Sequence, residues 1–213
     1  MLFNNEVENL IKINVIGAGG HARVILSIFT SLKATNVFVY DDSYTESNMS
    51  YNNLKVVGPI SYDITGNTII AIGSNIKRKY FRDYLVNATW VTCIHEKAII
   101  DSNVQIGEGT VVMAGAIIQP GTKIGRHCII NTGACIDHDC VVGDFCHIGP
   151  NAALAGGVNV GEGSFIGIGS SVIPYITIGK WSTIGAGSAV IQDIPDNCIA
   201  AGVPAVIKKI VNE

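Results

Sequence analysis

The stretch IGRHCIINTGACIDHDCVVGDFCHI, residues 124–148, carries an aliphatic side chain at every sixth position. The same spacing runs without a miss from Ile100 to Val190. Neither the 3.6-residue period of a helix nor the two-residue period of a strand produces a strict period of six. A short fixed period is typical of a solenoid, and six residues is the repeat of a parallel β-helix. The sixteen aliphatic positions are Ile100, Ile106, Val112, Ile118, Ile124, Ile130, Ile136, Val142, Ile148, Leu154, Val160, Ile166, Val172, Ile178, Ile184 and Val190.

The other positions of the repeat fit a narrow prism. A small or compact residue usually stands two places before the aliphatic one, and glycine follows it at eight of the sixteen positions. We expect the aliphatic and small side chains to alternate inward along short strands, with glycine relieving the corners where the backbone turns. The pattern resembles the left-handed β-helix hexapeptide superfamily, in which three hexapeptides make one triangular coil, and this resemblance implies about five coils over residues 98–193.

The chain before the repeat has a different pattern, in which strands alternate with helices. The predicted strands are 13–16, 37–40 and 68–72, and Ser74 caps a predicted helix over residues 75–86. A polar leader, residues 1–11, precedes them. Such alternation predicts a small parallel sheet. We therefore expect an α/β, Rossmann-like domain over residues 1–95, and the resemblance of the hexapeptide repeat implies a left-handed parallel β-helix domain over residues 96–213.

Composition excludes several classes of function. The chain has 213 residues, of which 48% are hydrophobic and 15% charged, with a net charge of −3. No basic field is available to attract a phosphate backbone, so we expect no nucleic-acid partner. No run of eighteen apolar residues and no signal peptide occur, so we expect no membrane span and a cytoplasmic protein. The one basic cluster, Lys77, Arg78, Lys79 and Arg82, is interpreted as a solvated helix face.

Six cysteines raise the question of disulfides or a metal. Cys128, Cys140 and Cys146 occupy the small inward slot of the repeat, where cysteine acts as a compact hydrophobic residue. There is no C-x-x-C pair, so we expect structural thiols and no zinc or redox site.

A glycine-rich turn, Gly17-Ala18-Gly19-Gly20-His21-Ala22, follows the first predicted strand, and the second strand ends on Asp41-Asp42. This arrangement satisfies the dinucleotide fingerprint, in which glycine N–H groups approach phosphate and an acid takes ribose hydroxyls. Fewer than a hundred residues supply only one mononucleotide-binding half, so a single nucleotide fits better than NAD. The alternative is a turn with a packing role alone.

The glycine turn, Asp41-Asp42, Ala71-Ile72-Gly73 and the hexapeptide region together resemble the bacterial nucleotide-sugar N-acetyltransferases of the left-handed β-helix hexapeptide superfamily. The resemblance spans residues 13–207 and implies acetyl-CoA as co-substrate. Its nearest type acetylates a UDP-linked 4-amino-4,6-dideoxy sugar on the way to bacillosamine, and relatives act on dTDP-linked sugars. Sialic acid O-acetyltransferases share the layout. The positions that match the family's substrate contacts are Gly19, Gly20, His21, Asp41, Asp42 and Gly73.

His138 is the candidate general base. Acyl transfer to an amine needs a group that removes a proton and a donor for the tetrahedral oxyanion. His138 stands two places after the inward Ile136, so it points outward, and Asp137 and Asp139 flank it. A neighbouring carboxylate orients an imidazole and raises its basicity. The resemblance implies that His138 is the base, Asp139 its partner and Gly156 the oxyanion donor. The alternative is a solvated surface histidine.

The same resemblance places acetyl-CoA against His147, Ile168 and Ala186. His147 lies nine residues, half a coil, from His138, so the two face different sides of the prism, and a site between subunits of a homotrimer could use both. The tail 202–209 resembles the family's C-terminal motif, or else simply caps the last coil.

A zinc enzyme of the carbonic anhydrase type would need three converging imidazoles. The histidines at 127, 138 and 147 lack the close H-x-x-x-x-H pair of that family, and we expect no metal. His95 and His127 are interpreted as structural.

We therefore expect an acetyl-CoA-dependent N-acetyltransferase acting on the 4-amino group of a UDP- or dTDP-linked 4-amino-4,6-dideoxy sugar for surface glycan biosynthesis, such as O-antigen. Two alternatives stay open: a sialic acid O-acetyltransferase and a non-catalytic nucleotide-sugar-binding scaffold.

Overall fold

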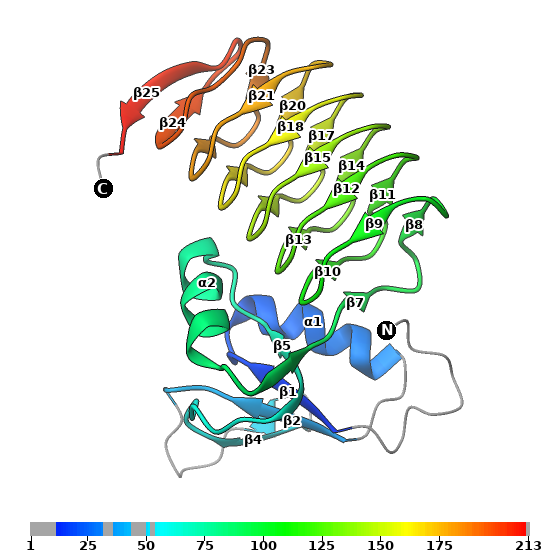
Figure 1. Ribbon diagram of the computed structural model, residues 1–213, viewed down its shortest axis with the longest axis vertical. Helices are drawn as coiled ribbons and strands as arrows, with labels where there is room; N and C mark the ends of the chain where they lie inside the picture. Colours follow the sequence, from blue (N-terminus) through cyan, green and yellow to red (C-terminus); the bar gives the residue numbers. More distant parts are fainter. Residues whose placement is uncertain (1–11, 32–35, 44–49, 52–53, 212–213) are drawn as a thin grey trace. The chain divides into compact units, whose positions relative to one another are not determined.

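The computed structural model of the chain describes residues 12–31, 36–43, 50–51 and 54–211. The polar leader predicted over residues 1–11 lies outside the described residues. The chain divides into two compact units, residues 1–94 and 95–213, which are coloured blue to green and green to red in Figure 1.

The first unit is built on a parallel sheet with the strand order β4-β2-β1-β5-β6, to which β3 adds one antiparallel edge strand. The strands of this sheet are β1 (Ile13–Ile16), β2 (Val37–Tyr40), β3 (Ser50–Tyr51), β4 (Leu54–Gly58), β5 (Gly66–Ile70) and β6 (Ala88–Trp90). Strand β7 (Cys93–Ile94) is outside this sheet and ends the unit. All four residues of β1 are buried, as a central parallel strand requires.

Two helices complete the unit, α1 (Gly20–Ser31) and α2 (Asn75–Tyr84). Ser74 caps α2 as predicted, since its hydroxyl accepts a hydrogen bond from the Lys77 N–H at 3.4 Å. Helix α2 ends two residues earlier than expected, because Leu85 has the non-helical backbone angles φ −92° and ψ 65°. Its N–H closes the last turn on the carbonyl of Phe81, and its side chain enters the core beside Ile16. The third predicted strand, 68–72, also ends earlier than expected, since β5 ends at Ile70. The predicted α/β class is confirmed.

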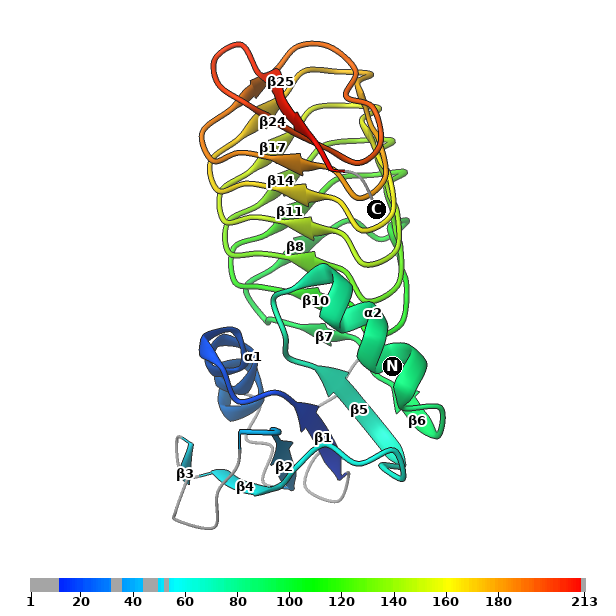
Figure 2. The same cartoon turned by 90° about the vertical axis from the view of Figure 1, so that its left-hand side faces the viewer.

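The second unit is a left-handed parallel β-helix of two-residue strands, as predicted (Figures 1 and 2). Its strands form three sheets, in the orders β25-β24-β22-β19-β16-β13-β10, β23-β20-β17-β14-β11-β8 and β21-β18-β15-β12-β9. From β8 to β23, neighbours in a sheet are 18 residues apart, as in the pair Ile130 and Ile148, so three hexapeptides make one coil. The strands are β8 (Ile99–Ile100), β9 (Gln105–Ile106), β10 (Val111–Val112), β11 (Ile117–Ile118), β12 (Lys123–Ile124), β13 (Ile129–Ile130), β14 (Cys135–Ile136), β15 (Val141–Val142), β16 (His147–Ile148), β17 (Ala153–Leu154), β18 (Asn159–Val160), β19 (Phe165–Ile166), β20 (Ser171–Val172), β21 (Thr177–Ile178), β22 (Thr183–Ile184), β23 (Ala189–Val190), β24 (Cys198–Ala201) and β25 (Val206–Ile210).

The core of the β-helix follows the repeat. Every aliphatic position from Val112 to Val190 is at most 4% exposed, and only Ile100 and Ile106, in the first coil, are half-buried. The small slot has a second role that the sequence did not reveal. Thr110 donates its hydroxyl hydrogen to the Gly125 carbonyl at 2.8 Å, and the Cys128 thiol donates to the Gly143 carbonyl at 3.0 Å. The slot residues therefore also satisfy buried backbone acceptors of the following hexapeptides.

The glycines after the aliphatic positions act by close approach. A Cβ on Gly125 would lie 2.6 Å from the backbone nitrogen of Asp144 in the next coil, and one on Gly161 would lie 2.7 Å from that of Lys180. The backbone turns with positive φ two residues later, at Gly109 and Gly163 among others. The glycines that follow the aliphatic residues therefore relieve steric contact between coils at the corners, and a second set of residues adopts the positive φ of the turn.

Among the described residues, no helix has both the length and the apolar character needed to cross a membrane.

Candidate active site

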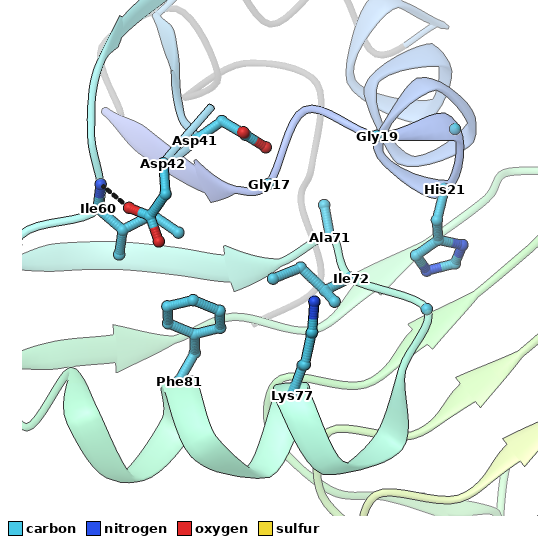
Figure 3. Close-up of a pocket in the computed structure, with 12 residues that line it drawn as sticks. Gly17, Gly19, His21, Asp41, Asp42, Ile60, Ala71, Ile72, Lys77 and Phe81 are labelled. Atoms are coloured by element: carbon cyan, nitrogen blue, oxygen red, sulfur yellow. Dashed lines mark hydrogen bonds between the residues drawn. The ribbon is translucent and has the colours of Figure 1, made fainter. Parts of the chain in front are cut away.

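A pocket of about 340 Å³ opens at the carboxyl edge of the sheet in the first unit (Figure 3). Strand β1 lies between β2 and β5, so the chain reverses its direction of progress across the sheet at this point. Parallel α/β sheets bind ligands at such switch points. The pocket is lined by Gly17, Gly19, Gly20, His21, Asp41, Asp42, Ile60, Ala71, Ile72, Gly73, Lys77 and Phe81, which include all six predicted substrate positions.

Asp41 joins the end of β2 to the glycine turn. Its Oδ2 accepts a hydrogen bond from the Ala18 N–H at 2.6 Å, and its Oδ1 accepts from the backbone and the hydroxyl of Ser43. Burial raises the pKa of Asp41, but the hydrogen bonds from Ser43 and Ala18 outweigh it, so the pKa lies below its ordinary value. Asp41 is ionised at neutral pH and holds the turn in place.

Asp42 presents a second carboxylate, which is exposed. Its Oδ1 accepts a hydrogen bond from the Ile60 N–H at 3.0 Å, which joins the end of β2 to the segment after β4 (Figure 3). Asp42 and Ile60 therefore form one wall of the pocket.

His21 lies at the start of α1 and is half-buried. Burial, followed by the charge of Arg78, lowers the pKa of His21 to about 4. The imidazole is therefore neutral at pH 7 and adds no positive charge to the pocket.

The basic cluster on α2 does not form the single solvated face that the sequence suggested. Arg78 is 1% exposed, and its guanidinium donates to the carbonyls of Ile72 and Gly73 at 3.2 and 2.9 Å. It therefore fixes the loop that follows β5. Lys79 is paired with Asp83 at 2.9 Å.

Lys77 and Phe81 are pocket residues that sequence reasoning missed. Both extend from α2 toward the pocket, one turn of the helix apart (Figure 3). The spacing of four residues was a usable signal, since residues i and i+4 share one face of a helix. The Lys77 ammonium gives the pocket a cation close to the glycine turn.

His138 lies at a corner of the β-helix, between β14 and β15, and its side chain is 52% exposed. Its Nδ1 lies 2.9 Å from Oδ2 of Asp139, and its backbone N–H donates to Asp137. The hydrogen bond to Asp139, then the charge of Asp137, raises the pKa of His138. Because Nδ1 is engaged, Nε2 is the nitrogen that is available for proton transfer.

Gly156 lies directly under this imidazole, one coil further along. A Cβ on Gly156 would be 2.5 Å from His138 Nε2. Within the part of the chain that the structure describes, the Gly156 N–H donates no hydrogen bond. The structure therefore brings together His138, Asp139 and Gly156, with the imidazole over the glycine.

The predicted acetyl-CoA positions lie elsewhere on the prism. Ile168 and Ala186 are both exposed and share the corner that leads from the first sheet to the second, since the Gly187 N–H bonds to the Ile168 carbonyl. His138 lies at the next corner, between the second sheet and the third. His147 is in β16, where its Nε2 is 3.0 Å from the Asn131 amide nitrogen. One copy of the β-helix does not bring the two sets together.

His127 is 1% exposed, and its ring stacks on Phe145 with centroids 5.4 Å apart. All six cysteines are free thiols. Among the described residues, no group of three or more His, Cys, Asp or Glu side chains is arranged to hold a metal ion.

The whole chain is similar to perosamine N-acetyltransferase from Caulobacter crescentus, whose solved structures include variants in complex with CoA and GDP-perosamine. For one of these variants the identity is 38% and the TM-score 0.85, and the similarity covers 94% of this chain and 98% of that chain. This chain belongs to the nucleotide-sugar N-acetyltransferases of the hexapeptide superfamily.

Each of the two units of this N-acetyltransferase matches its own family model. Residues 12–85 match the PglD N-terminal domain, and residues 103–138 and 121–156 match the bacterial transferase hexapeptide of six repeats. The acetyltransferase domain of PglB from Neisseria gonorrhoeae, solved with acetyl coenzyme A, is 34% identical with a TM-score of 0.84 over 92% of this chain and 98% of that one.

Among curated relatives, UDP-N-acetylbacillosamine N-acetyltransferase from Bacillus subtilis is 43% identical over 116 residues, which cover 48% of this chain and 51% of the relative. An uncharacterized protein of Acanthamoeba polyphaga mimivirus is 34% identical over 102 residues, which cover 46% of this chain and 20% of the viral protein. The chain thus spans about half or less of the curated relatives that it matches.

Proposed function

We propose that this chain transfers an acetyl group from acetyl-CoA to the amino group of a nucleotide-linked 4-amino-4,6-dideoxy sugar, for surface glycan biosynthesis. The observation that carries the proposal is the corner where His138, oriented by Asp139 at 2.9 Å, has its Nε2 over Gly156, whose N–H donates no hydrogen bond among the described residues. Family membership and the pocket at the switch point of the sheet support the same reaction.

In the proposed mechanism, His138 Nε2 removes the proton that the sugar amine must lose as its nitrogen attacks the thioester carbonyl. Asp139 and Asp137 stabilise the imidazolium that forms. The Gly156 N–H donates to the oxyanion of the tetrahedral intermediate. When the C–S bond breaks, the proton on His138 passes to the CoA thiolate, which restores the neutral base.

We assign the nucleotide to the pocket of the first unit. The glycine turn with Gly19 and Gly20 precedes α1, where backbone N–H groups and the helix dipole favour phosphate. Lys77 adds a cation at the same pocket. We assign Asp42 to the nucleoside, with Asp41 holding the turn. The neutral His21 and Gly73 complete the substrate contacts.

We propose a homotrimer for the active molecule. His138 lies at one corner of the prism and Ile168 and Ala186 at another, so a site that uses both needs two copies of the chain. A closed threefold arrangement supplies three identical junctions of this kind. In each junction, one copy would contribute the base and its neighbour the acetyl-CoA groove with His147. We place the enzyme in the cytoplasm, where acetyl-CoA and nucleotide sugars are made.

The test is acetyl-CoA turnover with a panel of UDP-, dTDP- and GDP-linked 4-amino-4,6-dideoxy sugars, beside free sialic acid. We expect turnover of at least one nucleotide-linked amino sugar and none of sialic acid. Turnover of sialic acid alone would make the chain an O-acetyltransferase. Binding of the nucleotide sugars without any turnover would make it a scaffold.

Calorimetric titration of the full chain tests the pocket separately. Nucleoside diphosphates should bind and NAD should not, because the first unit supplies only one mononucleotide-binding half. Tight NAD binding without a response to any nucleoside diphosphate would contradict the assignment of the pocket.

A further inference from the structure

Tyr175 is an exposed aromatic residue in a strained backbone conformation. It is 78% exposed, more than any other large hydrophobic residue among those described. Its φ is +62°, a region that bulky residues rarely adopt. The equivalent places in the three preceding coils are held by Gly121, Asp139 and Gly157. Positive φ recurs at this place in the turns of the hexapeptides, so the coil itself imposes it, and the residue there is most often glycine.

Other aromatic residues with positive φ are explained by packing, and Tyr175 is not. At a different corner of the prism, Phe145 is 5% exposed and stacks on His127. Trp181 lies over a glycine of the preceding coil, Gly163, as Tyr175 lies over Gly157, but Trp181 is half-buried. Tyr175 leaves most of its ring in solvent, so core packing does not account for it.

Tyr175 belongs to the same corner as His138. Its N–H donates to the Gly156 carbonyl at 3.0 Å, and the Gly157 N–H donates to the His138 carbonyl at 2.9 Å. The imidazole of His138 covers Gly156, and the ring of Tyr175 covers Gly157, where a Cβ would lie 2.6 Å from Cδ1. The two glycines are adjacent, with Cα atoms about 3.8 Å apart. The two rings therefore approach neighbouring points from opposite coils.

We propose that Tyr175 is the aromatic wall of the acceptor-sugar site and contacts the apolar face of the amino sugar whose amine is bound at His138. The inference rests on the proposed function. The carbon skeleton of the sugar is bonded to the amine at Nε2, so it lies next to the side chain over the adjacent residue, where carbon atoms make contact at about 3.5–4.0 Å. Because Gly156 and Gly157 have no side chains, no other side chain occupies the space under the two rings. The ring thereby orients the amine for attack, with little effect on the acetyl donor.

The test compares Tyr175→Gly, Tyr175→Phe and wild type in steady-state kinetics with the nucleotide amino sugar and acetyl-CoA. Glycine accepts the positive φ without strain, so the Gly variant removes the ring alone. We expect kcat/KM for the sugar to fall about 10- to 100-fold in the Gly variant, while KM for acetyl-CoA stays unchanged. The Phe variant, which keeps the ring, should stay within about twofold of wild type.

Trp181→Gly is the matched control, since it removes an aromatic ring with positive φ from another corner. It should leave the kinetics for the sugar unchanged. Calorimetry gives a readout independent of turnover: the Gly variant should lose affinity for the nucleotide amino sugar but bind the nucleoside diphosphate as wild type does.

Three results would overturn the proposal. The first is wild-type kinetics in Tyr175→Gly, which would leave the proposed function intact. The second is a change of mass in light scattering, which would make Tyr175 a subunit contact. The third is a wild-type protein that neither binds nor acetylates any nucleotide amino sugar, which would also remove the proposed function.

Discussion

At the scale of single residues, the chemistry depends on which atoms the neighbours leave available. Asp139 engages one nitrogen of His138 and leaves the other beside Gly156. Both carboxylate oxygens of Asp41 accept hydrogen bonds, from Ala18 and Ser43, so Asp41 mainly holds the glycine turn that forms the pocket. Neither fact follows from residue type, because each depends on a hydrogen bond within the corner or the turn.

Replacing His138 with alanine should lower kcat by about 10²–10⁴, because it removes the general base. The side chain is half exposed, so the thermal unfolding temperature should change little. Pro120→Ala, at the same corner one coil away, is the control and should keep wild-type activity. A His138→Ala enzyme within a few-fold of wild type in kcat would exclude this residue as the base.

The pH dependence of kcat/KM should report the raised pKa of His138. The imidazole accepts a proton only when it is neutral, so activity is present above this pKa and is lost as the pH falls through it. Asp139→Asn removes the largest cause of the raised pKa, so the acidic limb should move to lower pH. An acidic limb that does not move in the Asn variant would show that another group controls it.

Lys77→Ala should weaken binding of nucleoside diphosphates about tenfold, because it removes a charge-assisted contact with phosphate. Lys79→Ala is the matched control on the same helix, where the lysine pairs with Asp83 and does not line the pocket. Calorimetric titration of both variants measures the difference. Equal losses in the two variants would indicate only a general effect of charge.

At the scale of elements, the corners of the β-helix impose two distinct demands on glycine. Gly125 faces the backbone of the next coil at a distance that excludes a Cβ, whereas Gly169 has open space around it and a φ of +65°. The first demand is steric contact between coils, and the second is the conformation of the turn. Both come from stacking strands at the fixed spacing of a sheet.

These demands predict different losses of stability. Gly169→Ala should cost about 1–2 kcal/mol, the strain of a left-handed conformation for a residue with a Cβ. Gly125→Ala should cost clearly more, because the coils must also separate. Thermal or denaturant unfolding of the two variants gives the comparison. A loss in Gly125→Ala no larger than that in Gly169→Ala would contradict the close-approach explanation.

At the scale of the whole molecule, the separation of His138 from Ile168 and Ala186 makes one chain insufficient for the proposed site. Each corner is continued by residues 18 positions away, so features on one corner remain on it along the entire helix. The homotrimer that we propose would supply a second copy, whose acetyl-CoA groove would face the base.

Light scattering should give the mass of a trimer at micromolar concentration. A sharper measurement mixes subunits of His138→Ala with subunits of Ile168→Glu, each of which should be inactive alone. Mixed trimers contain junctions in which both corners are wild type, so part of the activity should return. A monomer mass, or no recovery in trimers shown to be mixed, would exclude a site shared between copies.

The β-helix could be predicted from the sequence, because each hexapeptide has an aliphatic residue at its inward position and all sixteen repeats have it at the same place. It also indicated the glycine turn and the acids that follow β2, since the ends of parallel strands converge at one edge. These features are local in the chain, or repeat with a period that shows how the chain folds.

Only the tertiary structure decided the rest. Arg78 and Lys77 are adjacent on one helix, yet one is buried under the loop after β5 and the other borders the pocket. Cys128 looks apolar in the repeat, yet its thiol donates to Gly143. Tyr175 shares a corner with His138 only because coils stack, with Gly156 and Gly157 in the coil between them. In each case the role is set by a partner distant in sequence, and which partner a side chain meets is decided when helices pack on the sheet and coils stack on coils.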